Sequence, residues 1–317
     1  MRSTLAWAAA LLCQSVGTGA FAAPAGTAEP AAPPRDLTEL SLSDLVQVKV
    51  TSVSKEPVER QRTAAAVTVI TQDDIRRSGA TTLAEVLRLA PGVAVARIDS
   101  THWSIGVRGF GDQFSKSVLV LIDGRNVYTP LFAGVFWGLQ DTVLADIDHI
   151  EVIRGPGGRI WGANAVNGVI NIITKKARDT HGTLAALTGG TVDHGIGEVR
   201  YGGGNGRNVD YRVYGKGTDR GDQSHSDGQD FDTLRMGQAG GRVDWTLGPR
   251  DSLTVQADGY GGRLGQSVSL ASYAPPSETT FYDPLHVSGG NAVARWQREL
   301  AAGSDLQVQA YYDHTHL

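Results

Sequence analysis

The chain has 317 residues and a formal net charge of -4, and 41% of its residues are hydrophobic. This near-neutral charge offers no basic surface for nucleic acid, so no nucleic-acid partner is expected. Beyond the N-terminus no run of about eighteen apolar residues indicates a membrane-spanning helix. The only cysteine, Cys13, lies close to the N-terminus, so the rest of the chain cannot form disulfides or thiolate metal sites.

The N-terminus has the three parts of a secretory signal peptide. Arg2 supplies a positive charge, residues 5–16 are mainly apolar, and Ala20-Phe21-Ala22 has the small residues of a cleavage site. We therefore expect residues 1–22 to be a signal peptide and the mature chain to begin near Ala23.

The next two segments precede the first folded domain. Residues 23–45 begin rich in alanine and proline and are predicted to be a flexible periplasmic tether. Residues 46–60 contain a short alternating stretch, Val46 to Val53, with no evident hairpin partner beside it. Such a stretch can add to the sheet edge of another protein, or it can be the first strand of the domain that follows. The spacing is compatible with both interpretations.

Residues 61–177 have a mixed helix and strand pattern. Val118 to Ile122 is a continuous apolar run of strand length, which predicts a strand covered on both faces. Further strands are expected at residues 66–70, 149–154 and 168–174, where β-branched residues are frequent.

Two short helices are predicted between these strands. The first should begin with Thr71 as its cap and end at Gly79. The second should begin with a capping box from Thr82 to Glu85 and end before Pro91-Gly92. Its apolar residues, which share one face, are Leu83, Val86, Leu87 and Ala90.

A turn with the sequence Gly155-Pro156-Gly157-Gly158 joins two of the predicted strands. A phosphate-binding P-loop requires a Lys-Ser/Thr pair after its glycines, and none follows here. A dinucleotide fingerprint requires a third glycine at a fixed spacing and a helix, whereas the spacing fails and another strand follows. We therefore interpret the turn as structural and do not expect a nucleotide site.

Beyond residue 177 the sequence contains strand patterns only. Apolar and polar residues alternate near residues 209–214, 242–247, 253–258 and 306–313, and about seven strands are predicted between Thr183 and Leu317. From the second link onward, short and long connections alternate, as expected for a transmembrane barrel with turns at one rim and loops at the other.

In this order, these patterns resemble the plug domain and first barrel strands of TonB-dependent outer-membrane receptors. The matching blocks are Pro91 to Val93, Arg108-Gly109, Ile122 to Gly124 and residues 147–176. The resemblance implies an α+β plug domain at residues 61–177 and antiparallel transmembrane β-barrel strands at residues 178–317. A complete barrel of this kind has roughly 22 strands, so we expect a truncated record or gene product.

The resemblance also implies functional residues. The TonB-box candidates, which the TonB protein would grip, are Val48, Lys49, Val50, Thr51, Ser52 and Val53. The plug-motif and gating candidates are Arg108, Gly109, Asp123, Gly124, Glu151, Arg154, Gly155, Pro156 and Gly157. Charges within a plug persist only when they are paired. We therefore expect Arg108, Glu151 and Arg154 to contact one another and the inner barrel wall, as a structural network or as a gate.

The implied function is energised uptake across the cell outer membrane, so we expect neither enzyme activity nor a cofactor. The implied partners are TonB with its inner-membrane energising complex, outer-membrane lipid, and a small extracellular ligand. That ligand would be a metal chelate, such as a ferric siderophore or cobalamin. The alternative is an exported periplasmic ligand-binding module with a soluble β-sandwich, because soluble sheets alternate in the same way.

A cluster of carboxylates in residues 218–233 is a weak candidate for calcium binding through oxygen ligands. Its members are Asp219, Asp222, Asp227, Asp230 and Asp232. Their spacing does not match an EF-hand, and a solvated loop is the simpler interpretation. His314 and His316 share a strand face, but a metal site needs about three or four ligands.

Overall fold

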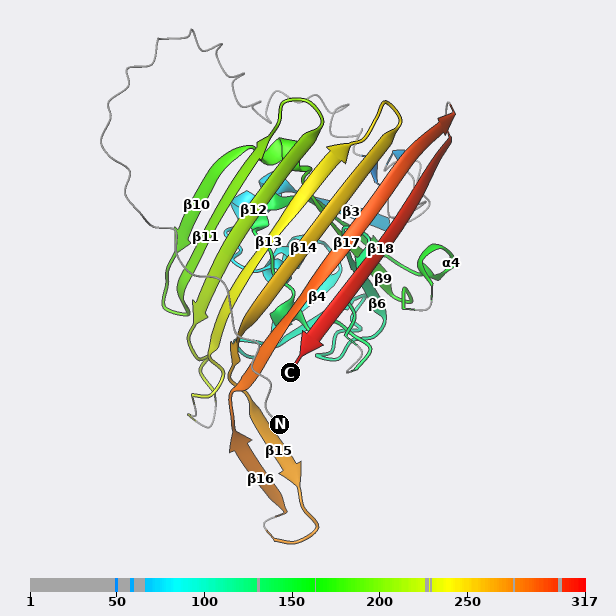
Figure 1. Ribbon diagram of the computed structural model, residues 1–317. Helices are drawn as coiled ribbons and strands as arrows, with labels where there is room; N and C mark the ends of the chain where they lie inside the picture. The colour runs from blue at the N-terminus through cyan, green and yellow to red at the C-terminus, as the bar shows by residue number, and fades with distance from the viewer. Residues whose placement is uncertain are drawn as a thin grey trace, which may run out of the picture.

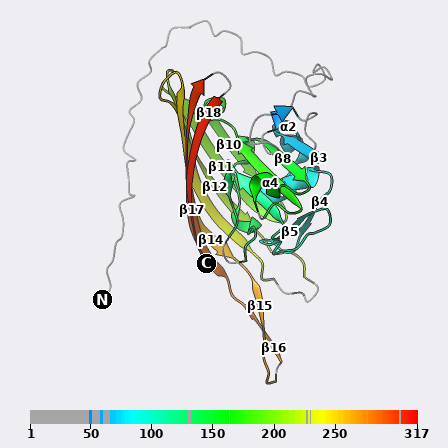
Figure 2. The same ribbon diagram turned by 90° about the vertical axis from the view of Figure 1, so that its right-hand side faces the viewer.

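The computed structural model describes residues 49–50, 58–59, 66–129, 132–162, 164–225, 228, 230–275, 277–301 and 304–317. The predicted signal peptide and tether, residues 1–45, lie outside these ranges. Two layers are seen in Figures 1 and 2: an N-terminal domain of mixed helix and strand, residues 66–177, and a long C-terminal sheet against which it lies.

A five-stranded sheet forms the centre of the N-terminal domain, with the order β3-β8-β9-β6-β7. The strands are β3 (Ala66–Thr71), β6 (Val118–Ile122), β7 (Arg125–Asn126), β8 (Ile147–Arg154) and β9 (Gly168–Thr174). β6 and β9 are parallel and the other pairs are antiparallel. As predicted, β6 is covered on both faces, since Val118 to Leu121 are all buried. A separate hairpin consists of β4 (Val93–Arg97) and β5 (Trp103–Val107).

The two predicted helices are present, and both begin at the predicted caps. In α2 (Gln72–Ser78), Thr71 and Asp74 form a reciprocal capping box, and Gly79 ends the helix at φ 69°. In α3 (Leu83–Val86), the Thr82 hydroxyl accepts from the Glu85 amide at 3.2 Å. The Glu85 carboxylate instead accepts from the Thr81 amide, also at 3.2 Å, so the predicted box does not close on Thr82.

Short helical turns complete the domain. The first, η3 (Leu87–Leu89), continues α3, and the face predicted to be apolar is buried. The others are η4 (Trp137–Leu139), η5 (Leu144–Asp146) and η6 (Ala177–Thr180). The one-turn helix α4 (Gly158–Trp161) follows the glycine-rich turn. It was not predicted, because a single turn is too short to show a helical period. Among the described residues no helix is long and apolar enough to cross a membrane.

The C-terminal sheet has seven antiparallel strands in the described part of the chain, in agreement with the predicted number of about seven, but the same range also contains a separate two-stranded hairpin that was not predicted. They are β10 (Gly182–Thr188), β11 (Asp193–Gly204), β12 (Val209–Arg220), β13 (Leu234–Thr246), β14 (Asp251–Leu264), β17 (Leu285–Ala301) and β18 (Ser304–His316). Each pairs with the next one along the chain, except that β14 pairs with β17. The intervening β15 (Ser267–Ala271) and β16 (Glu278–Tyr282) form a hairpin that projects beyond the sheet at the lower end of Figure 1.

Burial in the C-terminal sheet is the reverse of that in a soluble sheet. Val213 and Val243 are 52% and 39% exposed, whereas their neighbours Arg212 and Arg242 are 6% and 7% exposed. The polar face of the sheet is therefore covered, by the N-terminal domain, and the apolar face is open. A soluble sheet would bury its apolar face.

Candidate functional site

Polar side chains hold the N-terminal domain to the C-terminal sheet, and Asp146 is central among them. Asp146 ends η5 with a side chain that is only 2% exposed. It forms ion pairs with Arg200 of β11 and, at 3.6 Å, with Arg212 of β12. Arg212 also donates to the Lys175 carbonyl oxygen at 2.6 Å and to the Thr174 hydroxyl at 3.0 Å. This carboxylate therefore neutralises buried cations from two adjacent strands of the sheet.

The turn between β6 and β7 makes a second contact with the sheet. Asp123 and Gly124 have φ of 49° and 79°, so the chain reverses sharply here. The Asp123 carboxylate accepts from the amide and the hydroxyl of Thr174, at 2.9 and 2.8 Å, which binds the turn to the end of β9. Its carbonyl oxygen accepts from Arg295 of β17. The predicted plug-motif residue Asp123 thus lies at the junction of the two layers.

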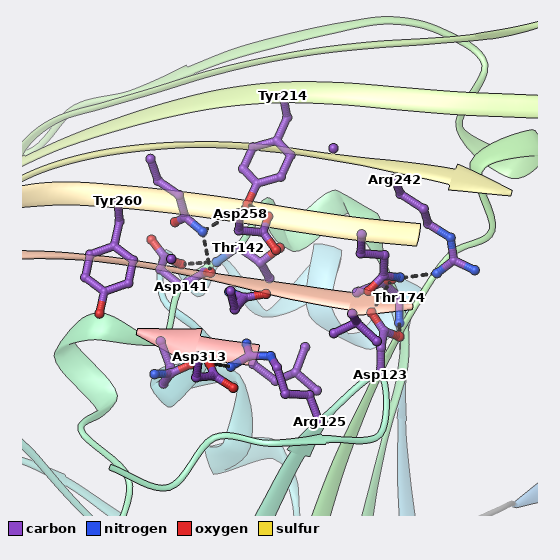
Figure 3. Close-up of a pocket in the computed structure, with 18 of the residues that line it drawn as sticks. Asp123, Arg125, Asp141, Thr142, Thr174, Tyr214, Arg242, Asp258, Tyr260 and Asp313 are labelled. Carbon is purple, nitrogen blue, oxygen red and sulfur yellow. Dashed lines mark hydrogen bonds and ion pairs between the residues drawn. The ribbon is translucent and has the colours of Figure 1, made fainter. Parts of the chain in front are cut away.

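A polar cavity of about 60 Å³ lies between the two layers next to this turn (Figure 3). Arg125 and Asp313 form an ion pair across it at 2.5 Å. On the sheet side, Tyr214 donates to Asp258 at 2.5 Å and accepts from Gln238 at 2.9 Å. The cavity has room for a few water molecules, and its polar lining suits them.

A third contact lies on the segment between η4 and η5. Lys216 of β12 forms an ion pair with Asp141 at 2.8 Å and donates to the Thr142 carbonyl oxygen at 3.0 Å. Gln238 of β13 donates to the Asp141 carbonyl oxygen at 3.0 Å. Neither Asp141 and Asp146 nor the basic residues of the sheet were predicted from the sequence as site residues. The signal was present, since cations on the polar face of adjacent strands require nearby anions.

The structure brings together part of the predicted gating set. Arg108, with φ 61°, donates to the Arg154 carbonyl oxygen at 3.0 Å. Glu151 is completely buried on β8 and accepts from His149 and Asn171, at 3.3 and 3.4 Å. The contacts described above between the domain and the sheet come from Asp123, which was predicted as a plug-motif and gating candidate, and from residues that were not predicted. Contact of Arg108, Glu151 and Arg154 with the barrel wall stays a prediction.

The glycines of the predicted motif have steric roles. Gly155, with φ 145°, lies against the Arg108 guanidinium, and Gly157 faces Val169 so closely that a Cβ would meet its side chain at 2.8 Å. Gly109 has φ 83°, a left-handed value that favours glycine. Pro156 is exposed in the turn. These steric and backbone constraints maintain the turn.

His149 is flanked by two carboxylates on β8. Burial disfavours its charged form, but hydrogen bonds to Asp148, at 2.6 Å, and to Glu151, at 3.3 Å, outweigh this effect and raise the pKa of His149 to about 9. The ring is therefore protonated at neutral pH and supplies the buried Glu151 with a positive partner.

The predicted TonB-box segment is described only at two positions. β1 (Lys49–Val50) pairs antiparallel with β2 (Val58–Glu59), with Val50 opposite Val58. The expectation that no hairpin partner lies nearby was therefore wrong. The partner is two residues long, too short to show an alternating pattern. Val48 and residues 51–53 lie outside the described part of the chain.

An aromatic hollow of about 430 Å³, here called the rim hollow, lies at the base of the β15–β16 hairpin. Its aromatic residues are Trp103, Phe114, Phe132, Phe136, Trp137 and Phe231. Five come from the N-terminal domain, three from its loops, one from β5 and one from η4, and Phe231 comes from the long link between β12 and β13. The size and the apolar lining are typical of a small-molecule site. This site was not predicted from the sequence, because its aromatic residues are scattered over more than one hundred positions.

Asp99 and His102 form the polar wall of the rim hollow. The Asp99 carboxylate accepts from the amides of Thr101 and His102 and from His102 Nδ1, each at 2.7 Å. Burial opposes ionisation, but these hydrogen bonds, with that from His102 foremost, lower the pKa of Asp99 to about 2. The His102 ring stacks on Phe136 with centroids 5.6 Å apart. Asp99 therefore fixes the orientation of the ring and leaves Nε2 as its remaining polar atom.

The N-terminal domain is also tied to the long link between β12 and β13, next to the rim hollow. Asp232 is fully buried and accepts from the amides of Ser100 and Gln223, at 2.7 and 2.9 Å. Ser100 donates to the Gly221 carbonyl oxygen at 2.6 Å. Since Ser100 follows Asp99 and Asp232 follows Phe231, these bonds position two parts of the hollow.

The carboxylates considered for calcium are engaged in other contacts or lie apart. Asp219 forms an exposed ion pair with Arg235 at 3.3 Å, and Asp232 accepts from backbone amides. Asp222 is half-buried, Asp230 is exposed, and Asp227 lies outside the described residues. In the described part of the chain, no group of three or more His, Cys, Asp or Glu residues is placed to hold a metal ion.

Comparisons with known proteins agree with this architecture. Residues 59–169 match the family model of the TonB-dependent receptor plug domain. The ferric enterobactin receptor of Pseudomonas aeruginosa is 32% identical over 235 residues, covering 63% of this chain and 31% of the relative. The vitamin B12 transporter BtuB of Vibrio vulnificus is 33% identical over 129 residues, covering 40% and 20%. The chain thus spans about a third or less of the length of these curated relatives.

Solved structures show the same fold. The ferripyoverdine receptor of the Pseudomonas aeruginosa outer membrane has a TM-score of 0.63 and 20% identity, covering 84% of this chain and 36% of that one. The open form of the ferric-catecholate import receptor Fiu from E. coli K12 has a TM-score of 0.65 and 20% identity, covering 85% and 41%.

A mixed domain held by polar contacts to the covered face of an antiparallel sheet defines the plug-and-barrel class of proteins. Within that class, the N-terminal domain is a TonB-dependent receptor plug domain, and the resemblance predicted from the sequence is confirmed. The C-terminal sheet corresponds to barrel strands of such receptors and is not closed in this structure.

Proposed function

We propose that the chain acts in an outer-membrane receptor that takes up a small external ligand with energy supplied through TonB. The ligand, a metal chelate such as a ferric siderophore or a cobalamin, would bind in the rim hollow. Residues 46–60 would contact TonB, and residues 61–177 would act as the plug. This proposal assigns to the chain the kind of function that the names of its relatives state, which are a ferric enterobactin receptor and a vitamin B12 transporter.

The observation that carries the proposal is the reversed burial of the C-terminal sheet. Val213 and Val255 are 52% and 42% exposed, while Arg212 and Gln256 beside them are 6% and 9% exposed. An open apolar face suits contact with lipid, and a covered polar face suits the interior of a barrel. A soluble β-sandwich requires the opposite arrangement.

The contacts between the two layers suit a plug that moves. Most of those described are single hydrogen bonds and ion pairs of charged side chains, and water can replace such a hydrogen bond at a net cost of about 1.5–3 kcal/mol. One apolar cluster also joins the layers, with Leu139 packed against Leu234, Leu264 and Val287. The plug can therefore rearrange without exposing its own hydrophobic core, which lies within the domain.

The route from TonB to the plug would run through β3. This strand lies at the edge of the domain sheet and pairs only with β8 among the described strands. It is also the first strand of that sheet after the candidate TonB-contact segment. A pull on residues 46–60 would therefore act first on an edge strand, which has one partner to lose.

The energy link is tested by Val50→Pro in cells that express the gene. Proline removes the backbone N–H that a strand added to TonB would donate. We expect uptake of radiolabelled cobalamin or iron chelate to fall to the level of cells without TonB, while binding to chilled cells persists. Val50→Ala, which keeps the N–H, is the matched control. Uptake that survives Val50→Pro would make this segment an ordinary strand of the plug.

The soluble alternative is tested by fractionation of the same cells. The outer-membrane proposal expects the chain in the outer-membrane fraction, from which only detergent releases it. Recovery in the periplasmic extract after osmotic shock would favour an exported β-sandwich module and would overturn the proposal.

A further inference from the structure

The rim hollow has an unusual balance of charge for a site that would capture a metal chelate. Its lining residues include six aromatic rings and one histidine but no lysine or arginine among the described residues. Its acidic residue, Asp99, is ionised at neutral pH, as its lowered pKa shows. With the nearby His102 neutral or protonated, the pair carries a charge of minus one or zero.

Two arginines close to the hollow, Arg97 and Arg220, make contacts outside its lining. Arg97 packs its guanidinium over the Trp103 ring at 5.3 Å and donates to the Asp99 carbonyl oxygen at 3.3 Å, but it does not line the hollow. Arg220 is bound to Asp193 at 2.5 Å and to the Ser100 carbonyl oxygen at 3.2 Å. Arg220 is not available to a ligand without breaking these contacts. Arg97 has an Nη2 atom without a hydrogen-bond partner among the described residues, but it lies over the Trp103 ring and does not line the hollow.

Basic residues are instead concentrated at the contact between the two layers. Arg125, Arg212 and Arg242 line the polar cavity of Figure 3. The lining of that cavity also includes five aspartates, so its arginines have counter-charges of their own, whereas the lining of the rim hollow is mainly aromatic. A polyanion that entered the rim hollow would lose water and find no lysine or arginine among the described lining residues to replace it, which is costly. It would also face the negative π-surfaces of the rings, which attract cations.

Resting on the proposed function, we infer that the rim hollow binds a ligand without net negative charge, one that presents a flat or apolar surface to the aromatic rings. His102 Nε2 supplies a polar contact for orientation. An uncharged or cationic chelate or macrocycle meets these requirements, and a polyanionic chelate does not. Selection against the polyanion comes from the missing counter-charge as much as from attraction of the preferred ligand.

The test uses the full chain purified in detergent and the quenching of tryptophan fluorescence, since Trp103 and Trp137 line the hollow. The probes are cyanocobalamin, an uncharged iron(III) trihydroxamate and a trianionic iron(III) tricatecholate. We expect at least one uncharged probe to bind more tightly than the trianion by about tenfold or more. Equal or tighter binding of the trianion would overturn the charge inference and leave the receptor proposal intact. Failure of all three probes to bind would count against the hollow as the capture site, and so against both.

Two variants connect the binding to the hollow. Phe114→Ala removes a lining ring and should weaken the uncharged probe by about tenfold. Phe110→Ala is the matched control, because Phe110 is 63% exposed and does not line the hollow. Gln266→Lys introduces a cation into the lining and should tighten binding of the trianion severalfold. A trianion affinity unchanged by Gln266→Lys would contradict the inference that the absence of cations sets the preference.

Discussion

The N-terminal domain and the C-terminal sheet use the same alternation of apolar and polar residues with opposite results. In the domain, Val152 and Ile172 are fully buried, as in a soluble protein. In the sheet, Val213 is 52% exposed, and Arg212 next to it is 6% exposed. Alternation therefore shows that a strand has two faces, and the partner of each face decides which is buried. For the sheet, that partner is a domain that presents carboxylates and carbonyl oxygens to the buried cations.

The strongest test of the comparison removes the shared carboxylate. Asp146→Asn leaves Arg200 and Arg212, which are 11% and 7% exposed, without their main anion. Breaking a buried pair typically costs about 3–5 kcal/mol, so urea-induced release of the domain should occur at clearly lower concentration. Asp179→Asn is the control, because its 3.7 Å pair with Arg178 is exposed. Equal midpoints for the two variants would mean that the contact does not hold the layers together.

The next effect concerns the open apolar face. Val213→Lys places a charge where lipid is expected and should cost about 2–4 kcal/mol near the bilayer centre. The measurement is the fraction of chain that associates with lipid vesicles and resists carbonate extraction. Leu270→Lys, on the exposed β15–β16 hairpin, is the matched control and should have little effect. If both lysines reduced association equally, the sheet would not be the surface that meets lipid.

The third effect is a pH dependence of stability that arises within the N-terminal domain, at His149, and not in the sheet. The pKa of His149 is raised to about 9, outweighing its burial, by Asp148 and Glu151. The stability that its charge contributes is therefore complete below about 6.5 and is lost as pH rises through 9, an effect of about 1–2 kcal/mol after allowance for partial exposure. Unfolding midpoints at pH 7 and pH 10 test this, with His149→Gln as the comparison. If the unfolding midpoint of His149→Gln fell as much between pH 7 and pH 10, the pH dependence would come from other groups.

The smallest effect tests local structure within the domain. Thr71→Ala removes the hydroxyl from the cap of α2, and with it the bond from the Asp74 amide and the bond to the Asp74 carboxylate, while the backbone amide of residue 71 can still donate to Asp74. Loss of such a cap costs about 1 kcal/mol. The unfolding midpoint of the domain should shift accordingly. Thr279→Ala in the exposed β16 should leave that midpoint unchanged, and a cap variant that behaved like it would show that α2 does not depend on its cap.

Much of the domain could be predicted because its signals are local. The caps at Thr71 and Thr82, the buried run of β6 and the bounds of β9 each depend on residues close in sequence. The number of strands in the C-terminal sheet was also predicted, from alternation and link length. Short features escaped prediction: α4 and β2 are too brief to display a period.

The contacts that join the layers could not be predicted from sequence in the same way. Arg200 is 54 residues from Asp146, and Arg295 is 172 residues from Asp123. Pairing over such distances is set by how the layers stack, which no local pattern encodes. The sequence could indicate that cations on the polar face of the sheet need anions, but it could not indicate which ones. The rim hollow could not be predicted for the same reason, because its aromatic rings meet only after four separate segments of the chain come together.

The hydrogen bond from Arg295 to the Asp123 carbonyl oxygen has a consequence for the order in which parts of the protein fold. The Asp123 carboxylate can bind Thr174 as soon as the N-terminal domain has been synthesised. The Asp123 carbonyl oxygen can accept from Arg295 only after β17 has been synthesised. Contacts that close long loops form late because the entropy of closure must be offset first. We therefore expect the domain to fold as a nearly finished unit whose last bonds form only when the sheet assembles against it.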